Sequence, residues 1–241
     1  MSRERAAEAA GAALAGGALG GLVGSLVGLG IPVAAVAGLN GAVSGWRRVY
    51  QWRRPAGVLA FALDSTWAIP TTSAGVVAHA VGAVRGRPGF SPALSERQNR
   101  HVYERGMQIR RGFATTFGNV VCGAGDVSRA RRAKLVTDHE DVHVWQARWF
   151  GPAYPVLYLG WMLGGGAAGA AVWAVTRRDE RFPRVVESCA YYLNPFEWWA
   201  YSRDDHWPPH GIVERVGWRR PMVRSFASLG GTRHRRGAEP S

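Results

Sequence analysis

Residues 135–150 read LVTDHEDVHVWQARWF and contain two histidines four positions apart, with a glutamate directly after the first. On an α-helix, side chains four residues apart lie on one face about 6 Å from each other, so His139 and His143 can both reach one metal ion. Zinc accepts neutral imidazole nitrogen, and catalytic zinc sites keep one coordination position for water. Glu140 is placed to take a proton from that water. The stretch therefore predicts a metal-binding helix.

An ordinary capped helix is the alternative interpretation of the same stretch. Val142, Trp145 and Trp149 form an apolar stripe next to the face that carries the histidines. Thr137, followed three residues later by Glu140, also matches a capping box, in which the glutamate bonds the backbone and the histidines lie in solvent. Capping explains the glutamate but not the paired histidines, so the motif alone leaves both interpretations open.

Candidates for a third ligand lie downstream, in VESCAYYLNPFEWWAY at residues 186–201. Glu187 and Glu197 each stand three residues before an alanine. Asn194 and Pro195 are typical of a helix start, with asparagine as the N-cap and proline at the first helical position. This places Glu197 in the first turn of a predicted helix, where it is either a ligand or part of the cap.

The order HEDVHVWQ at 139–146 and NPFEWWAY at 194–201 resembles a recurring bacterial family of zincin-like proteins, many of which have no known activity. The resemblance covers residues 135–201 and implies a zincin-like helical core that binds Zn²⁺. The implied zinc ligands are His139, His143 and Glu197, with Glu187 in reserve. The resemblance also implies peptide hydrolysis with Glu140 as the general base.

An oxyanion-stabilising group does not follow from the motif, although zincin peptidases usually supply one. His101, Tyr192, Tyr201 and several arginines are the candidates. His206 and His210 are also four residues apart, but two prolines between them forbid a regular helix. Metal binding is therefore predicted more directly than catalysis.

The charge of the chain favours a membrane surface as its partner. Thirty lysines and arginines against 17 acidic residues give a formal net charge of +13. Nucleic acid is the less favoured partner, because no nucleic-acid-binding motif is present and arginine pairs flank apolar segments at 47–48, 53–54 and 177–178. Cys122 and Cys189 support neither a disulfide framework nor a cysteine-rich zinc cluster.

Residues 9–46 carry no charged side chain, and this run exceeds the ~20 residues of one transmembrane helix. A Gly- and Pro-containing break at 28–32 divides it into two arms. Glycines recur at every fourth position of the first arm, where they let a second backbone approach closely. These glycines are Gly16, Gly20, Gly24 and Gly28. The segment resembles the glycine-zipper membrane hairpins of bacterial proteins, which implies contact with membrane lipids and self-association through these glycines.

Two other interpretations of this segment remain, a flexible Ala/Gly-rich leader and a secretory signal that begins with Arg3 and Arg5. Glu4 and Glu8 interrupt the basic start that a signal requires. For the hairpin, arginines on both flanks predict that both ends lie in the cytoplasm.

Two further apolar stretches are predicted to form helical hairpins within the folded domain. Residues 56–83 contain Asp64 and His79, which are costly in a spanning helix, and break at Pro70. Residues 149–176 carry no charge, and a single crossing there would place His143 and Glu197 on opposite sides of a membrane. A glycine triplet at 164–166 predicts that the hairpin, over 152–176, turns back; a tilted single span is the alternative.

The fold class expected is mainly α with a small β element. Residues 86–98 are predicted as loop, and 101–121 as two short strands. Three parts follow: a membrane hairpin with basic flanks at 1–54, a zincin-like domain at 55–215, and a basic, disordered tail at 216–241.

The function expected is that of a zinc-binding protein at the bacterial cytoplasmic membrane, with the zincin-like domain on the cytoplasmic side. In the enzyme hypothesis it is a zinc metallopeptidase acting on a peptide or protein that the sequence does not specify. The alternatives are a non-catalytic membrane structural or scaffold protein whose histidines are structural, and a basic membrane-surface scaffold without metal.

Overall fold

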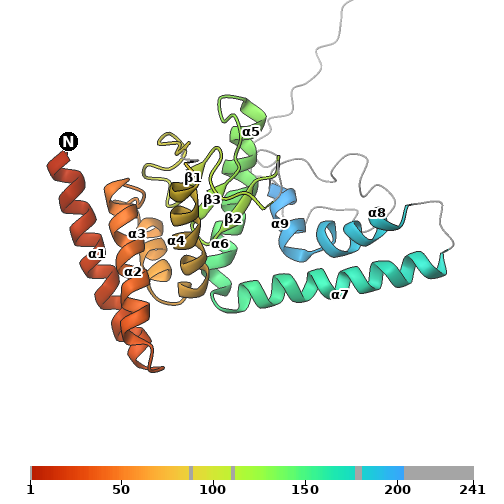
Figure 1. Ribbon diagram of the computed structural model, residues 1–241, viewed down its shortest axis with the longest axis horizontal. Helices are drawn as coiled ribbons and strands as arrows, with labels where there is room; N and C mark the ends of the chain where they lie inside the picture. Colours follow the sequence, from red (N-terminus) through yellow and green to blue (C-terminus); the bar gives the residue numbers. More distant parts are fainter. Residues whose placement is uncertain (1, 87–88, 110–111, 177–180, 204–241) are drawn as a thin grey trace, which may run out of the picture. The chain divides into compact units, whose positions relative to one another are not determined.

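The computed structural model shows a mainly helical protein with one small three-stranded sheet (Figure 1). This confirms the coarse prediction of a mostly α fold with a small β element. The chain divides into two compact units, residues 1–161 and 162–241. The structure describes residues 2–86, 89–109, 112–176 and 181–203. The predicted basic tail lies outside the described residues, as do His206 and His210.

Helices α1 (Ser2–Ser25) and α2 (Gly30–Trp46) form an antiparallel hairpin (Figure 1). Glycine lets the two backbones approach closely: a Cβ atom at Gly16 would lie 2.9 Å from the carbonyl oxygen of Ala37, and one at Gly24 would lie 2.8 Å from that of Leu29. Gly28, the fourth glycine of the row, lies in the turn instead, with φ of +73°. The close approach predicted for the glycines is therefore made within the chain, and self-association through them remains a prediction.

The second apolar stretch forms α3 (Pro55–Ser65) and α4 (Ile69–Val84), whose axes are bent by 88°. The two helices thus meet at nearly a right angle, whereas an antiparallel hairpin is predicted there. The break falls just before Pro70, so this proline lies in the first turn of α4. Proline is tolerated there because an N–H group in the first turn has no acceptor within the helix.

Strands β1 (His101–Tyr103), β2 (Thr115–Phe117) and β3 (Val120–Cys122) form a sheet in the order β1-β3-β2. Strand β3 pairs parallel to β1 and antiparallel to β2. The two-residue turn between β2 and β3 begins with Gly118 at φ of +57°, which suits a tight hairpin turn. The sequence predicts two strands in this region, and the described structure has three.

The HExxH stretch lies in one continuous helical run that comprises α5 (Ala130–Lys134), the π-helix η1 (Leu135–Glu140) and α6 (Asp141–Phe150). One face of this run packs on the sheet through a buried apolar cluster. Its members are Val102, Val121, Ala124, Val136 and Val144. The sheet and the HExxH helix are therefore held as one piece, which fixes the direction in which the histidines point.

Helix α7 (Ala153–Val175) is continuous over 23 residues, so the predicted turn at the glycine triplet is wrong. Gly164 has no neighbour within 4 Å of where its Cβ atom would lie. A Cβ atom at Gly165 would lie 2.5 Å from the carbonyl oxygen of Cys189, and one at Gly169 would lie 3.0 Å from the Cα atom of Val186. Glycines four residues apart thus accommodate a second segment rather than ending the helix.

That second segment consists of α8 (Phe182–Glu187) and the π-helix η2 (Ser188–Tyr192), and α9 (Pro195–Arg203) follows them. Because η2 packs at Gly165, the chain returns along α7 only after the helix has ended at Val175. Glu197 therefore lies beyond the segment that packs on α7.

Helices α1 and α7 are each long and apolar enough to cross a membrane, as the membrane prediction requires. The bent pair α3 and α4 would count as a third crossing if it formed one span. Both cysteines, Cys122 and Cys189, are buried and form no disulfide within the part of the chain that the structure describes.

Candidate metal centre

His139, near the end of η1, and His143, in the first turn of α6, are buried with 2% and 6% of their surface exposed. Their Nε2 atoms lie 3.3 Å apart. Two nitrogens bound to one tetrahedral zinc ion at 2.0–2.1 Å lie about 3.3–3.4 Å from each other. The spacing of the two imidazoles therefore fits a shared ion.

The contact with Gln146 determines which nitrogen of the His143 ring carries the proton. Its Oε1 atom lies 2.8 Å from His143 Nδ1, and the Tyr154 hydroxyl lies 3.3 Å from the same nitrogen. An amide oxygen accepts a hydrogen bond, so Nδ1 carries the proton and Nε2 keeps the lone pair that a metal needs. The sequence places Gln146 on the histidine face but does not predict this role, although its position three residues after His143 is a contact spacing on a helix.

Glu140 is 5% exposed, and its Oε2 atom accepts a hydrogen bond of 2.7 Å from the Thr116 hydroxyl on β2. The capping-box interpretation is wrong, because Thr137 lies inside the helical run and its hydroxyl donates to the carbonyl oxygen of Lys134. Sequence reasoning missed Thr116, which no motif connects to Glu140. The strand thus fixes one oxygen of the carboxylate next to the histidine pair.

The downstream helix begins as predicted. Asn194 is its N-cap, since the Asn194 Oδ1 atom accepts a hydrogen bond of 3.1 Å from the backbone N–H of Phe196. Glu197 lies in the first turn of α9 and is buried, whereas Glu187 lies exposed at the end of α8.

His139, His143 and Glu197 form a buried group that can hold a metal ion. One ligand atom from each of the three lies within 4.8 Å of the other two. Two imidazole nitrogens and one carboxylate are ligands that zinc accepts, and they leave a fourth position. The residues that the sequence assigns as ligands thus suit the ion, whereas Glu187 is not part of the group.

Three of the candidate oxyanion groups, His101, Tyr192 and Tyr201, have contacts of their own. His101 is fully buried, with its Nε2 atom 2.9 Å from the Ser44 hydroxyl. Burial, then His79 and two arginines, lower its pKa well below the usual 6.5. Tyr192 and Tyr201 pack in an aromatic cluster with Tyr191.

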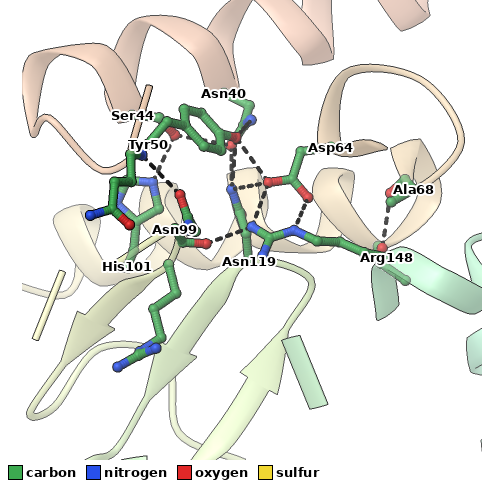
Figure 2. Close-up of polar contacts among 12 residues, drawn as sticks. Asn40, Ser44, Tyr50, Asp64, Ala68, Asn99, His101, Asn119 and Arg148 are labelled. Carbon is green, nitrogen blue, oxygen red and sulfur yellow. Dashed lines mark hydrogen bonds and ion pairs between the residues drawn. The ribbon is translucent and has the colours of Figure 1, made fainter. Parts of the chain in front are cut away.

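A second buried polar cluster, the Asp64–Arg148 network, joins α3 to the end of α6 (Figure 2). The Nε and Nη2 atoms of Arg148 donate to the two carboxylate oxygens of Asp64 at 2.9 and 2.8 Å. The Tyr50 hydroxyl donates to the same carboxylate at 2.9 Å, and the Asn119 amide donates to it at 3.3 Å. Asn40 of α2 completes the network by donating to the Tyr50 hydroxyl.

Tyr50 remains protonated within this network, because burial and then the Asp64 carboxylate raise its pKa far above the usual 10.0. The network therefore connects the N-terminal hairpin, α3, the sheet and the HExxH helix through groups that bond one another.

Comparison of the chain with protein-family models, with curated proteins and with solved structures gave no match.

Proposed function

We propose that this protein is a membrane-attached zinc hydrolase that cleaves peptide bonds. His139, His143 and Glu197 would hold the zinc ion, and Glu140 would act as the general base. The observation that carries the metal assignment is the 3.3 Å separation of the two Nε2 atoms, with Gln146 holding the proton of His143 on its other nitrogen.

Bound zinc would polarise a carbonyl group and lower the pKa of a water molecule. Glu140 would accept the proton of that water and pass it to the leaving amine. Thr116 fixes one oxygen of the Glu140 carboxylate, which leaves the other oxygen for the proton. Gln146 keeps the ring of His143 in the orientation and tautomer that binding requires.

Two features support a peptide as the substrate. The first is the resemblance of the HEDVHVWQ and NPFEWWAY stretches to zincin-like proteins. The second is that β2, which carries Thr116, is an edge of the described sheet. An extended peptide binds to such an edge through main-chain hydrogen bonds, and here it would run beside Glu140.

The attachment to a membrane is proposed from α1, which is long and apolar enough to enter one. Helix α7 is also long enough, but a single crossing there would place His143 and Glu197 on opposite sides, so it would lie along the membrane or dip into it. Arginines on both flanks of the α1–α2 hairpin support the cytoplasmic membrane of a bacterium, with the first unit on the cytoplasmic side.

A non-catalytic metal centre is the second candidate, and one observation favours it. His139, Glu140 and His143 are only 2%, 5% and 6% exposed, so little of the site faces solvent. A substrate could reach such a centre only if the site opened. In this case the protein would be a membrane scaffold stabilised by zinc.

Metal analysis and a peptidase assay on the detergent-purified protein separate these functions. We expect about one equivalent of zinc in the wild type and its loss in His139→Ala and in His143→Ala. Glu140→Gln should keep the zinc and lose hydrolysis of unstructured protein substrates. Absence of zinc from the wild type contradicts both candidates, whereas zinc with hydrolysis unaffected by Glu140→Gln supports the scaffold.

A further inference from the structure

The turn between α1 and α2 exposes a run of large apolar side chains. Leu26, Val27 and Ile31 are 82%, 72% and 87% exposed, and no charged residue occurs between Glu8 and Arg47. A hairpin that crosses a membrane twice places its turn in water, where polar side chains are expected. This turn reads SLVGLGI, and its only polar side chain is that of Ser25.

Four backbone N–H groups and the one hydroxyl of the turn bond within the chain. The backbone N–H groups of Leu26, Val27, Gly28 and Leu29 donate to carbonyl oxygens of residues 23–25 at 2.8–3.2 Å. The bonds from Gly28 to Ser25 and from Leu29 to Gly24 form a Schellman motif, in which Gly28 takes the left-handed conformation. The hydroxyl of Ser25 donates to the carbonyl oxygen of Gly21 at 2.7 Å. Such internal bonding is what hydrocarbon requires of a backbone and what water does not.

The opposite end of the hairpin is charged and tied to the folded unit. Glu8 accepts hydrogen bonds from Arg97 at 2.6 Å and from the Trp52 indole at 2.7 Å. Arg53 and Arg54 lie exposed in the same segment as Trp52, where they suit anionic lipid headgroups.

The distance between these two ends limits how far the hairpin can reach. From Glu8 to Leu26 is 18 residues of helix, which span about 27 Å at about 1.5 Å per residue. From Gly30 to Arg47 is 17 residues, or about 26 Å. The hydrocarbon core of a bilayer is about 30 Å thick, so a hairpin with its charged end at one surface ends inside the core.

We propose that the α1–α2 hairpin is a re-entrant membrane anchor whose turn, residues 25–31, lies among lipid acyl chains and does not reach the far side. The partner of this surface is the hydrocarbon of the bilayer, with anionic headgroups at the charged end. The inference rests on the membrane attachment proposed above and is independent of the metal. Under this proposal α1 enters the membrane without crossing it, although α1 alone is long enough to cross.

Bimane fluorescence in reconstituted vesicles tests this placement. Full-length Val27→Cys would be labelled with bimane in detergent and reconstituted into phosphatidylcholine–phosphatidylglycerol vesicles that contain acyl-chain-brominated lipid. Ser128→Cys, at an exposed turn of the same unit, is the matched control, and the unsubstituted chain corrects for the two buried cysteines. We expect strong loss of fluorescence at position 27 from brominated lipid but not from an aqueous quencher on either side, and the reverse at position 128.

Each other outcome contradicts the inference in a distinct way. Aqueous quenching of position 27 from the side on which position 128 is quenched means that the turn is not inserted, and quenching from the opposite side means that the hairpin crosses. Insensitivity to both quenchers, with cysteine cross-linking at position 27, identifies a second copy as the occupant. Failure of the wild type to float with vesicles contradicts the membrane attachment itself, whereas zinc content reports separately on the metal centre.

Discussion

Two buried polar clusters lie along the helical run that carries the HExxH motif, and they use their hydrogen-bonding groups differently. In the Asp64–Arg148 network, donors from Arg148, Tyr50 and Asn119 converge on one carboxylate, so opposite charges meet within the protein. In the histidine pair, two Nε2 atoms face each other at 3.3 Å. In the first cluster the protein supplies both the anion and the cation, whereas the second is a group that can hold a metal ion.

The largest effect should come from breaking the Asp64–Arg148 network. Asp64→Asn leaves the buried Arg148 guanidinium without its counter-charge, which should lower the free energy of unfolding by about 3–5 kcal/mol. Denaturant unfolding in detergent measures this loss. Asp126→Asn is the control, because it removes a carboxylate from an exposed ion pair with Arg129 and should change stability little.

The same variant also tests whether the two clusters are separate. Folded Asp64→Asn should still bind zinc at the wild-type ratio, since the hydrogen bonds of Asp64 within the described residues go to Tyr50, Asn119 and Arg148 and not to His139 or His143. Loss of zinc under conditions in which the variant is fully folded would show that the network also forms part of the metal centre.

A smaller effect is expected from the group that orients His143. Gln146→Leu removes the acceptor for the Nδ1 proton, which should weaken zinc affinity about 10–100-fold, as measured by competition with a chelator. Gln146→Glu retains an acceptor and should bind zinc close to normally. Equal affinity in the leucine variant and the wild type would mean that the proton position on His143 is set by another group.

The smallest predicted effect is the pH dependence of stability that arises from the buried His101 ring. Burial, then His79, Arg47 and Arg148, lower the pKa of His101, so the folded protein holds this ring neutral. Below about pH 6.5 the His101 ring binds a proton in the unfolded chain but not in the folded one. The free energy of unfolding therefore falls by up to about 1.4 kcal/mol for each pH unit below that value.

Unfolding of the metal-free protein between pH 7.5 and 5.5 measures this slope. His101→Gln keeps a hydrogen-bonding side chain beside Ser44 but does not titrate, so its stability should depend less steeply on pH than that of the wild type. An unchanged slope in this variant would assign the pH dependence to other histidines.

The parts of the structure that sequence could predict depend on short-range signals. Two histidines four residues apart share a helix face whatever the tertiary fold, and Asn194 before Pro195 specifies a helix start through one local hydrogen bond. The glycines of α1 predicted a close backbone contact for the same reason, because their spacing alone places them on one face.

The parts that could not be predicted depend on partners distant in the sequence. Asp64 stood out as an ionisable residue in an apolar stretch, but nothing local identifies Arg148 as its partner. Thr116 reaches Glu140 only because the sheet packs on the helical run. Because glycine has a low helix propensity, the triplet at 164–166 predicts a break in the helix. In the structure the helix is continuous, and its glycines Gly165 and Gly169 make room for α8 and η2 to pack against it.

The ion pair between Asp64 and Arg148 also has a consequence for the order in which the protein is made. The two residues are 84 positions apart, so at about 5–20 residues per second roughly 4–17 s separate their synthesis. Throughout this interval the Asp64 carboxylate of the nascent chain has no Arg148 guanidinium to pair with. Tyr50, whose hydroxyl donates to this carboxylate, is made before it. The Asp64–Arg148 ion pair, and the network built on it, can therefore form only after the last turn of the HExxH helix has been synthesised.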